Sequence, residues 1–334
     1  MRREGYPERI ARLGPTELDV FPLCLGGNVF GWTIDEQRSF EVLDAYAQAG
    51  GNFIDTADSY GRRGPSGAGA SEEIIGRWLA ARGNSQSIVI ATKVGSSPEL
   101  RGLSAATIRK GIDASLTRLG LETVDLYYAH RDDPETPLQE TLATFGELVE
   151  EGKIRYAAAS NYSAPRLSEA LRIGAQDGIA TYVALQTHYN LMERSEYERE
   201  LAPLCERHGL PCLAYFALAQ GFLTGKYRRG SEAGESPRAA GVRASYLDER
   251  GMRVLDALEL LAREHHTTMA AVALAWLLAQ PTVAAPIASA TSLEQLAQLL
   301  EAVELDLSAE QLELLDTASA EDEQDPALAA RDGG

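Results

Sequence analysis

Eight short apolar runs recur along the chain, most of them about 30 residues apart, with amphipathic stretches between them. Several runs are almost entirely apolar, as expected for parallel strands that pack inside a barrel and are covered by helices outside. Asp35 and Ser104 are typical helix starts, and Gly120 is a typical helix end. Eight such units predict a (β/α)8 TIM barrel. The runs lie at residues 21–26, 52–57, 87–94, 124–130, 154–160, 182–189, 211–218 and 283–289.

A doubly wound open sheet is the alternative architecture. It would require a glycine fingerprint such as G-x-G-x-x-G after the first strand, where this chain has LGGNVFG. A Gly-Pro turn in the segment RIARLGPTELDV predicts an N-terminal β-hairpin that closes the barrel floor.

The regular spacing of strands and helices is interrupted once, between the seventh and eighth apolar runs. Residues 226–251 are rich in Gly, Ser, Arg and Glu and predict a long mobile loop before a helix around 252–265. We expect a single domain over residues 1–318 that ends in a helical segment. The acidic stretch 319–334 is poor in large apolar residues and predicts a disordered tail.

The net charge of −18 argues against nucleic-acid and anionic-membrane partners, since both attract basic surfaces. An anionic ligand would therefore need a local basic or backbone-lined cradle. Cys24, Cys205 and Cys212 lack metal-ligand spacing, and Cys24 and Cys212 lie in apolar runs that predict buried, reduced thiols. No signal peptide and no apolar run of about 18 residues is evident, so we expect a cytoplasmic protein.

Four chemically distinctive residues stand at or just after the ends of predicted strands: Asp55, Tyr60, Lys93 and His130. The carboxyl ends of parallel barrel strands meet at one mouth, so these side chains should lie together. A tyrosine to donate a proton, a lysine to lower its pKa, a carboxylate to hold the lysine and a histidine to orient a carbonyl are the parts of a carbonyl reductase. Each residue alone also has an ordinary structural explanation.

Several segments that occur in order resemble the aldo-keto reductases: GGNFIDTADSYG, IATKVG, VDLYYAHRDDPETP, AAASNYS, LQTHYNL, AYFALAQGFLTGKY and PIASATSLEQL. The resemblance covers about residues 10–317. It implies reduction of an aldehyde or ketone with hydride from C4 of a nicotinamide cofactor and a proton from Tyr60. It also implies that a neutral His130 donates a hydrogen bond to the substrate oxygen.

The same resemblance assigns cofactor contacts to residues at the strand ends. Ser160, Asn161 and Gln186 would hold the nicotinamide carboxamide, and Tyr215 would stack on its ring; a helix cap is the alternative role of Asn161. Asp55 counts among the cofactor contacts as well. Backbone N–H groups and one ammonium would line the pyrophosphate. That cradle comprises Phe216, Ala217, Leu218, Gln220, Gly221, Leu223, Gly225 and Lys226, with Gly26, Gly27 and Asn28 under the nicotinamide.

Two positions depart from the family pattern. Phe216 replaces the usual serine, and Thr291 stands where an arginine usually meets the adenosine 2′-phosphate. Neutral groups of Ser289, Thr291, Ser292 and Gln295 remain there, and a neutral hydrogen bond is weaker than a charge-assisted one. The resemblance still implies NADPH, with NADH as a possible cofactor and a weaker preference between them.

The substrate pocket is expected between the loops after the first, second and fourth strands. Its predicted walls are Phe30, Trp32, Tyr60, His130 and Arg131; the aromatic walls suit an apolar or sugar-ring face, and Arg131 suits an anionic group. We expect a small carbonyl substrate and no metal. His188 has no partner at ligand spacing, which favours a packing role.

Two other functions remain open from the sequence. One is a regulatory barrel that binds the cofactor and senses its redox state without physiological turnover, as the channel-associated members of the family do. The other is a metal-dependent barrel hydrolase. An assay of cofactor oxidation would separate the first from a reductase, and a chelator would reveal the second.

Overall fold

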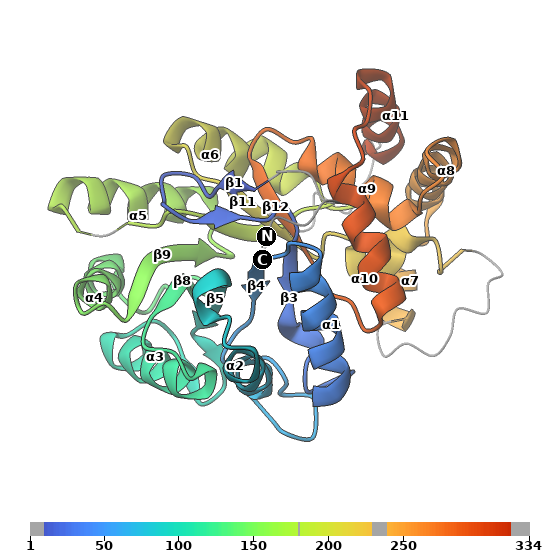
Figure 1. The fold of residues 1–334 in the computed structure, drawn as a ribbon. Coiled ribbons are helices and arrows are strands. Elements are labelled where there is room, and N and C mark those ends of the chain that lie inside the picture. The colour runs from blue at the N-terminus through green and yellow to red at the C-terminus, as the bar shows by residue number, and fades with distance from the viewer. Residues whose placement is uncertain (1–9, 180, 229–238, 322–334) are drawn as a thin grey trace.

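The computed structural model describes residues 10–179, 181–228 and 239–321. Its centre is a closed barrel of eight parallel strands, in which the last strand pairs with the first (Figure 1). This arrangement confirms the predicted (β/α)8 barrel and excludes the open sheet. In ring order the strands are β3 (Cys24–Gly26), β4 (Phe53–Asp55), β5 (Val89–Val94), β8 (Val124–Ala129), β9 (Ile154–Ser160), β10 (Leu185–His188), β11 (Cys212–Tyr215) and β12 (Val283–Ala288).

Helices surround the barrel (Figure 1). The α-helices are α1 (Glu36–Gln48), α2 (Ala70–Arg82), α3 (Ala105–Leu119), α4 (Leu138–Glu150), α5 (Ala164–Asp177), α6 (Ala202–His208), α7 (Ala239–Tyr246), α8 (Glu249–Glu264), α9 (Met269–Leu278), α10 (Leu293–Leu300) and α11 (Ala309–Ser319). Short helical turns are η1 (Gly27–Val29), η2 (Ser85–Ser87), η3 (Tyr197–Leu201), η4 (Ala219–Thr224) and η5 (Glu301–Val303).

Local signals set the helix ends as the sequence predicts. The Asp35 side chain accepts a hydrogen bond from the Arg38 N–H at the start of α1, and Ser104 does the same for Thr107 at the start of α3. Helix α3 ends at Gly120, whose φ of 65° lies in the left-handed region that favours glycine.

The N-terminal hairpin closes one end of the barrel. Strands β1 (Ala11–Arg12) and β2 (Asp19–Val20) pair antiparallel, as predicted. Leu13, Leu18 and Val20 of this hairpin pack in one cluster with interior barrel residues such as Phe53 and Leu126. A side chain at Gly14 would meet the ring of Pro211 at 2.5 Å, so the tight turn needs glycine there. The hairpin therefore forms the barrel floor and leaves the opposite end for a site.

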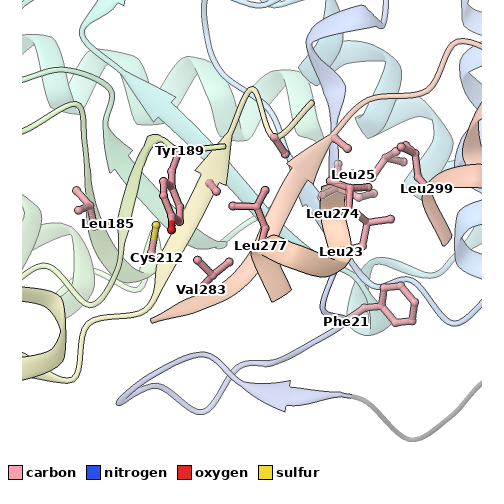
Figure 2. Packing of buried hydrophobic residues seen from close by; sticks show 14 of the residues in the cluster. Phe21, Leu23, Leu25, Leu185, Tyr189, Cys212, Leu274, Leu277, Val283 and Leu299 are labelled. Atoms are coloured by element: carbon pink, nitrogen blue, oxygen red, sulfur yellow. The ribbon is translucent and has the colours of Figure 1, made fainter. Parts of the chain in front are cut away.

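The larger part of the core lies between the barrel and its helices. Helix α9 is apolar on nearly all sides, because β12 covers one side of it and α8 packs against another. Figure 2 shows Leu274 and Leu277 of this helix beside β12, with Val283 and Cys212 close by. Cys24, Cys205 and Cys212 are buried free thiols, which confirms the sequence prediction for Cys24 and Cys212.

The structure adds elements that the sequence did not predict. A short antiparallel pair, β6 (Ser96–Ser97) and β7 (Leu100–Arg101), follows β5. Helix α7 occupies residues expected to form a loop, and α8 begins at Glu249, where the Asp248 side chain accepts from the Gly251 N–H. Helix α11 supplies the predicted C-terminal helical segment.

Two predicted segments lie partly outside the described residues. They are the long loop, of which residues 229–238 are not described, and the tail, of which residues 322–334 are not described. The domain boundary at residue 318 stays a prediction. Within the described ranges, no helix is both long and apolar enough to cross a membrane.

Candidate active site

A cavity of about 590 Å³ opens at the carboxyl ends of the barrel strands, opposite the hairpin floor. Most of the residues that the sequence assigns to a site line this one cavity, although they come from all parts of the chain. They are Gly26, Asn28, Trp32, Asp55, Tyr60, His130, Arg131, Ser160, Asn161, Gln186, Tyr215, Phe216, Ala217, Leu218, Gln220, Gly221, Lys226, Ser289, Thr291 and Gln295.

Lys93 does not line the cavity, but it contacts two predicted catalytic residues that do, Asp55 and Tyr60. Its Nζ donates to Asp55 Oδ2 at 2.6 Å, to the Thr56 carbonyl oxygen at 2.7 Å and to the Tyr60 hydroxyl at 3.2 Å. The ammonium thus has three oxygen partners, which matches its three donors. Lys93 is completely buried, so each of these bonds forms without competition from bulk water.

The pKa of Tyr60 differs from the sequence expectation. Burial is the largest influence and raises the pKa to about 12, while the charge of Lys93 lowers it and offsets only part of the burial effect. The prediction of a lowered pKa is therefore wrong in its net direction, although Lys93 acts in the predicted sense. Burial also disfavours the charge on Lys93, but the attraction of Asp55 and Tyr60 outweighs it and leaves the pKa of Lys93 raised.

His130 lies beside the Tyr60 ring. The two ring centroids are 6.2 Å apart and the rings meet edge to face at 77°. Burial, and then the charges of Lys93 and Arg131, lower the pKa of His130 well below its ordinary value, so the ring is neutral at pH 7. Its Nδ1 is buried and has no hydrogen-bond partner among the described residues.

Asn161 forms hydrogen bonds with residues at the ends of three barrel strands. Its Nδ2 donates to the His130 carbonyl oxygen and to Ser160 Oγ, each at 2.9 Å, and its Oδ1 accepts from the Tyr215 hydroxyl at 2.7 Å. The alternative role as a helix cap is wrong, since α5 begins after Ser163 without a side-chain cap. Gln186 spans the barrel in a similar way, because its Nε2 donates to Asp55 Oδ1 at 2.9 Å.

The loop after β11 has an unusual backbone. Phe216, Ala219, Gln220 and Gly221 all have positive φ angles, between 46° and 94°. Three of these are not glycine, and such a conformation persists only where the surrounding structure imposes it. The N–H groups of Ala217 and Leu218 donate to no acceptor in the described parts of the chain, and both residues line the cavity. Lys226 lines the cavity as well.

His188 lies directly behind Tyr215. Their rings stack with centroids 5.4 Å apart and planes inclined by 11°. Asn190 supports this arrangement, because its Nδ2 lies 3.3 Å from His188 Nε2 and donates to the Phe216 carbonyl oxygen at 3.0 Å. His188 does not line the cavity, so its position agrees with the packing role predicted for it.

The polar groups expected near the adenosine 2′-phosphate already bond to one another or, for Ser289, to Asn28. Gln295 Oε1 accepts from both the N–H and the hydroxyl of Thr291, at 2.8 and 2.9 Å. Ser289 Oγ donates to Asn28 Oδ1 at 2.7 Å, and Ser292 caps α10 by accepting from the Gln295 N–H. These side chains already have partners, and none of them is a cation.

Some predicted site residues lie elsewhere. Phe30 is fully buried in the core and does not line the cavity, because η1 turns its ring inward against Gly27. The prediction that Phe30 forms a pocket wall is therefore wrong. Gly27, Leu223 and Gly225 also lie outside the lining, while Trp32 lines it and has the Arg63 guanidinium 5.5 Å from its ring centroid.

The sequence reasoning missed several lining residues. Ile287, on β12, lies two residues before Ser289, and Gln298 lies about one turn beyond Gln295 on α10, so strand and helix periodicity could have indicated these two residues. The others carry no chemical signal. The missed set is Val29, Thr33, Ala270, Ile287, Ala288, Gln298 and Leu299. Among the described residues, no group of three or more His, Cys, Asp or Glu side chains could hold a metal ion.

A closed (β/α)8 barrel with polar residues collected at the carboxyl ends of its strands is the architecture of a barrel enzyme. Residues 22–320 match the model of the aldo/keto reductase family. The chain belongs to this family and is an oxidoreductase by that membership.

Individual relatives support the same assignment. The chain is 35% identical over 312 residues to an uncharacterized oxidoreductase, YrpG, of Bacillus subtilis, and the match covers 91% of this chain and 93% of the relative. It is 33% identical to a probable voltage-gated potassium channel subunit beta of Arabidopsis thaliana, over 88% and 90% of the two chains. Norsolorinic acid reductase A of Aspergillus parasiticus is 28% identical, over 90% and 78%.

Proposed function

We propose that this protein reduces the carbonyl group of a small aldehyde or ketone to an alcohol with a nicotinamide cofactor, NADPH or, less favourably, NADH. One observation carries the proposal: buried Lys93 holds Asp55 on one side and the Tyr60 hydroxyl on the other, at the wall of the cavity. A phenol coupled to a buried ammonium is suited to proton transfer. We place this activity in the cytoplasm.

The cavity fits such a cofactor chemically. The N–H groups of Ala217 and Leu218 and the ammonium of Lys226 suit phosphate oxygens, and Tyr215 presents an aromatic ring. Ser160, Asn161 and Gln186 supply amide and hydroxyl groups for a carboxamide. When bound, the nicotinamide group supplies a hydride from its C4 to the carbonyl carbon.

The chain's own residues supply the proton and the electrostatic stabilisation. A pKa of about 12 keeps Tyr60 protonated at neutral pH, as a proton donor requires. Lys93 stabilises the phenolate that remains after the proton leaves, and Asp55 keeps Lys93 in place. Neutral His130 donates a hydrogen bond to the substrate oxygen while negative charge develops there. Trp32, Tyr60, His130 and Arg131 form the pocket for the rest of the substrate.

A regulatory, cofactor-sensing barrel is the second candidate, and the similarity to a potassium channel subunit beta favours considering it. The intact set of Asp55, Tyr60, Lys93 and His130 favours turnover instead. Oxidation of NADPH and NADH, followed at 340 nm with a panel of small aldehydes, tests the proposal. We expect turnover with at least some aldehydes, unchanged by a chelator. Cofactor binding without turnover across the panel would overturn the reductase and support the regulatory candidate.

A further inference from the structure

We infer that the substrate carries an anionic group, most simply a carboxylate, and that Arg131 binds this group beside the carbonyl site. This inference rests on the proposed carbonyl reduction and specifies its substrate class. Arg131 follows His130 directly, lines the cavity and is exposed to solvent.

The guanidinium of Arg131 makes no hydrogen bond or ion pair with any described residue. The two acidic residues that follow it in the sequence are engaged elsewhere. Asp132 accepts a bidentate pair of hydrogen bonds from Arg166, at 2.8 and 3.0 Å. Asp133 Oδ2 accepts from the Leu103 N–H at 2.8 Å and from Thr136 Oγ1 at 2.7 Å. Neither acid neutralises Arg131.

The charges in the cavity lining leave Arg131 available. Its lining residues include two cations, Lys226 and Arg131, and one carboxylate, Asp55. Asp55 is already bonded to Lys93 and Gln186, and Lys226 belongs to the loop that suits the cofactor phosphates. Arg131 is thus the lining cation without an assigned anionic partner. Because the guanidinium presents a planar fork of donors, it is well matched to a carboxylate.

The charge of Arg131 acts at the carbonyl end of the cavity. It contributes to the lowered pKa of His130 and opposes the raised pKa of Tyr215. Glu193 and Glu196 also influence Tyr215, but neither lines the cavity or pairs with Arg131. In a chain with a net charge of −18, an anionic substrate is repelled at long range, so a local cation is needed to hold it.

Matched pairs of aldehydes test this inference. The 2-, 3- and 4-carboxybenzaldehydes are compared with the corresponding formylbenzamides, which keep a similar shape without the charge, and kcat/KM is measured for each. We expect the protein to favour at least one carboxylate over its amide by about tenfold or more, as a charge-assisted bond would give. In Arg131→Met this ratio should fall close to one, and Arg131→Lys should restore part of it.

Arg77→Met is the matched control, because Arg77 is a surface arginine on α2 that pairs with Glu36 outside the cavity. It should keep the wild-type ratio. If the wild type reduces the amides but prefers no carboxylate, or if Arg131→Met keeps the preference, the inference is wrong and the proposed reduction stands. A rise in the Kd of the cofactor that accounts for the whole effect of Arg131→Met would also overturn it.

A binding experiment decides the inference even if no aldehyde is reduced. Benzoate and benzamide are titrated calorimetrically into the protein saturated with NADP+. Tighter binding of benzoate by about tenfold, lost in Arg131→Met, supports an anion site at Arg131. Equal affinity for the two ligands overturns it. Absence of turnover with every aldehyde, by contrast, contradicts the proposed function.

Discussion

Two buried carboxylates three residues apart, Asp55 and Asp58, have opposite environments. Asp55 is 1% exposed and accepts hydrogen bonds from Lys93 at 2.6 Å and Gln186 at 2.9 Å. Asp58 is 3% exposed, and neither of its carboxylate oxygens makes a hydrogen bond of normal geometry with a described residue. Burial, followed by the charge of Glu72, raises the pKa of Asp58 to about 7.

The difference arises because Lys93 pairs with Asp55, whereas Arg118, whose charge also acts on Asp58, pairs with Glu72. Glu72 on α2 is completely buried and accepts from Arg118 Nε at 2.7 Å and from Thr92 Oγ1 at 2.6 Å. Arg118 therefore pairs with Glu72, and its charge lowers the pKa of Asp58 by less than burial and the charge of Glu72 raise it. A buried acid with partners can remain charged, whereas one without them holds its proton. Burial alone therefore does not decide whether a carboxylate is charged; its hydrogen-bond and ion-pair partners do.

The largest effect is expected at Tyr60, which shares Lys93 with Asp55. Tyr60→Phe removes the proposed proton donor, so kcat should fall by on the order of a thousandfold or more, a loss above about 4 kcal/mol, while cofactor binding stays nearly intact. Steady-state and single-turnover kinetics measure this. Tyr156→Phe, at a tyrosine outside the cavity, is the control. A Tyr60→Phe variant that keeps more than about a tenth of kcat, with chemistry rate-limiting, would contradict the assignment.

Lys93→Met would make Asp55 resemble Asp58, a buried acid without its cation. Activity should be lost, and the free energy of unfolding should fall by roughly 3–5 kcal/mol, as when a buried pair loses one partner. Lys93 lowers the pKa of Tyr60, so its removal should raise that pKa further. Any residual alcohol oxidation, which needs the phenolate, should then shift to higher pH. An active variant with an unchanged pH profile would refute the coupling.

Asp58→Asn tests the other carboxylate through protein stability. The folded pKa of about 7 lies above the unfolded value near 4, so the stability associated with this group is complete below about pH 4 and declines as the pH rises to 7. An uncharged amide avoids that decline. We expect the variant to be more stable than wild type at pH 8, by roughly 1–4 kcal/mol, with a smaller difference at pH 5.

Urea unfolding of the wild type and Asp58→Asn at both pH values measures this difference. Asp55→Asn is the matched variant and should instead be less stable, since it leaves Lys93 without its counter-charge. Equal or lower stability of Asp58→Asn at pH 8 would show that Asp58 is charged and well accommodated.

The smallest effect is expected beside Thr291, where the side chains proposed to meet the 2′-phosphate of the cofactor include no cation. Neutral groups of Ser289, Thr291 and Ser292 should give NADPH a preference within about a hundredfold, or roughly 3 kcal/mol. Thr291→Arg should tighten NADPH about tenfold and change NADH little, and it also frees Gln295 from Thr291. Quenching of intrinsic fluorescence measures both affinities. A wild-type preference well over a thousandfold would mean that another cation reaches the phosphate.

The barrel and the Asp55–Lys93–Tyr60 connection could be predicted from the sequence because both depend on local patterns. Apolar runs define the strands, and the end of each parallel strand faces the same mouth. The net pKa of Tyr60 could not be predicted, because burial is a property of the assembled barrel. The environment of Asp58 could not be predicted for a similar reason, since Glu72 and Arg118, which both act on its pKa, lie on separate helices.

The directions of individual side chains also could not be predicted from the sequence. The position of Phe30 after the first strand predicts a pocket wall, but the turn η1 places its ring in the core. The sequence also predicts Thr291 and Gln295 as two separate phosphate ligands, but they lie four residues apart around the start of α10 and bond to each other.

The hydrogen bond from Gln186 to Asp55 joins residues 131 positions apart, on strands β10 and β4. Contacts between distant parts of a chain form slowly, because closing the long intervening segment costs conformational entropy before the contact stabilises the fold. We therefore expect the proposed reductase site to be complete only after β4 and β10 have been brought together in the closed barrel. In refolding experiments, turnover should recover more slowly than the helical circular dichroism signal. The rate at which turnover recovers would then report the closure of the barrel.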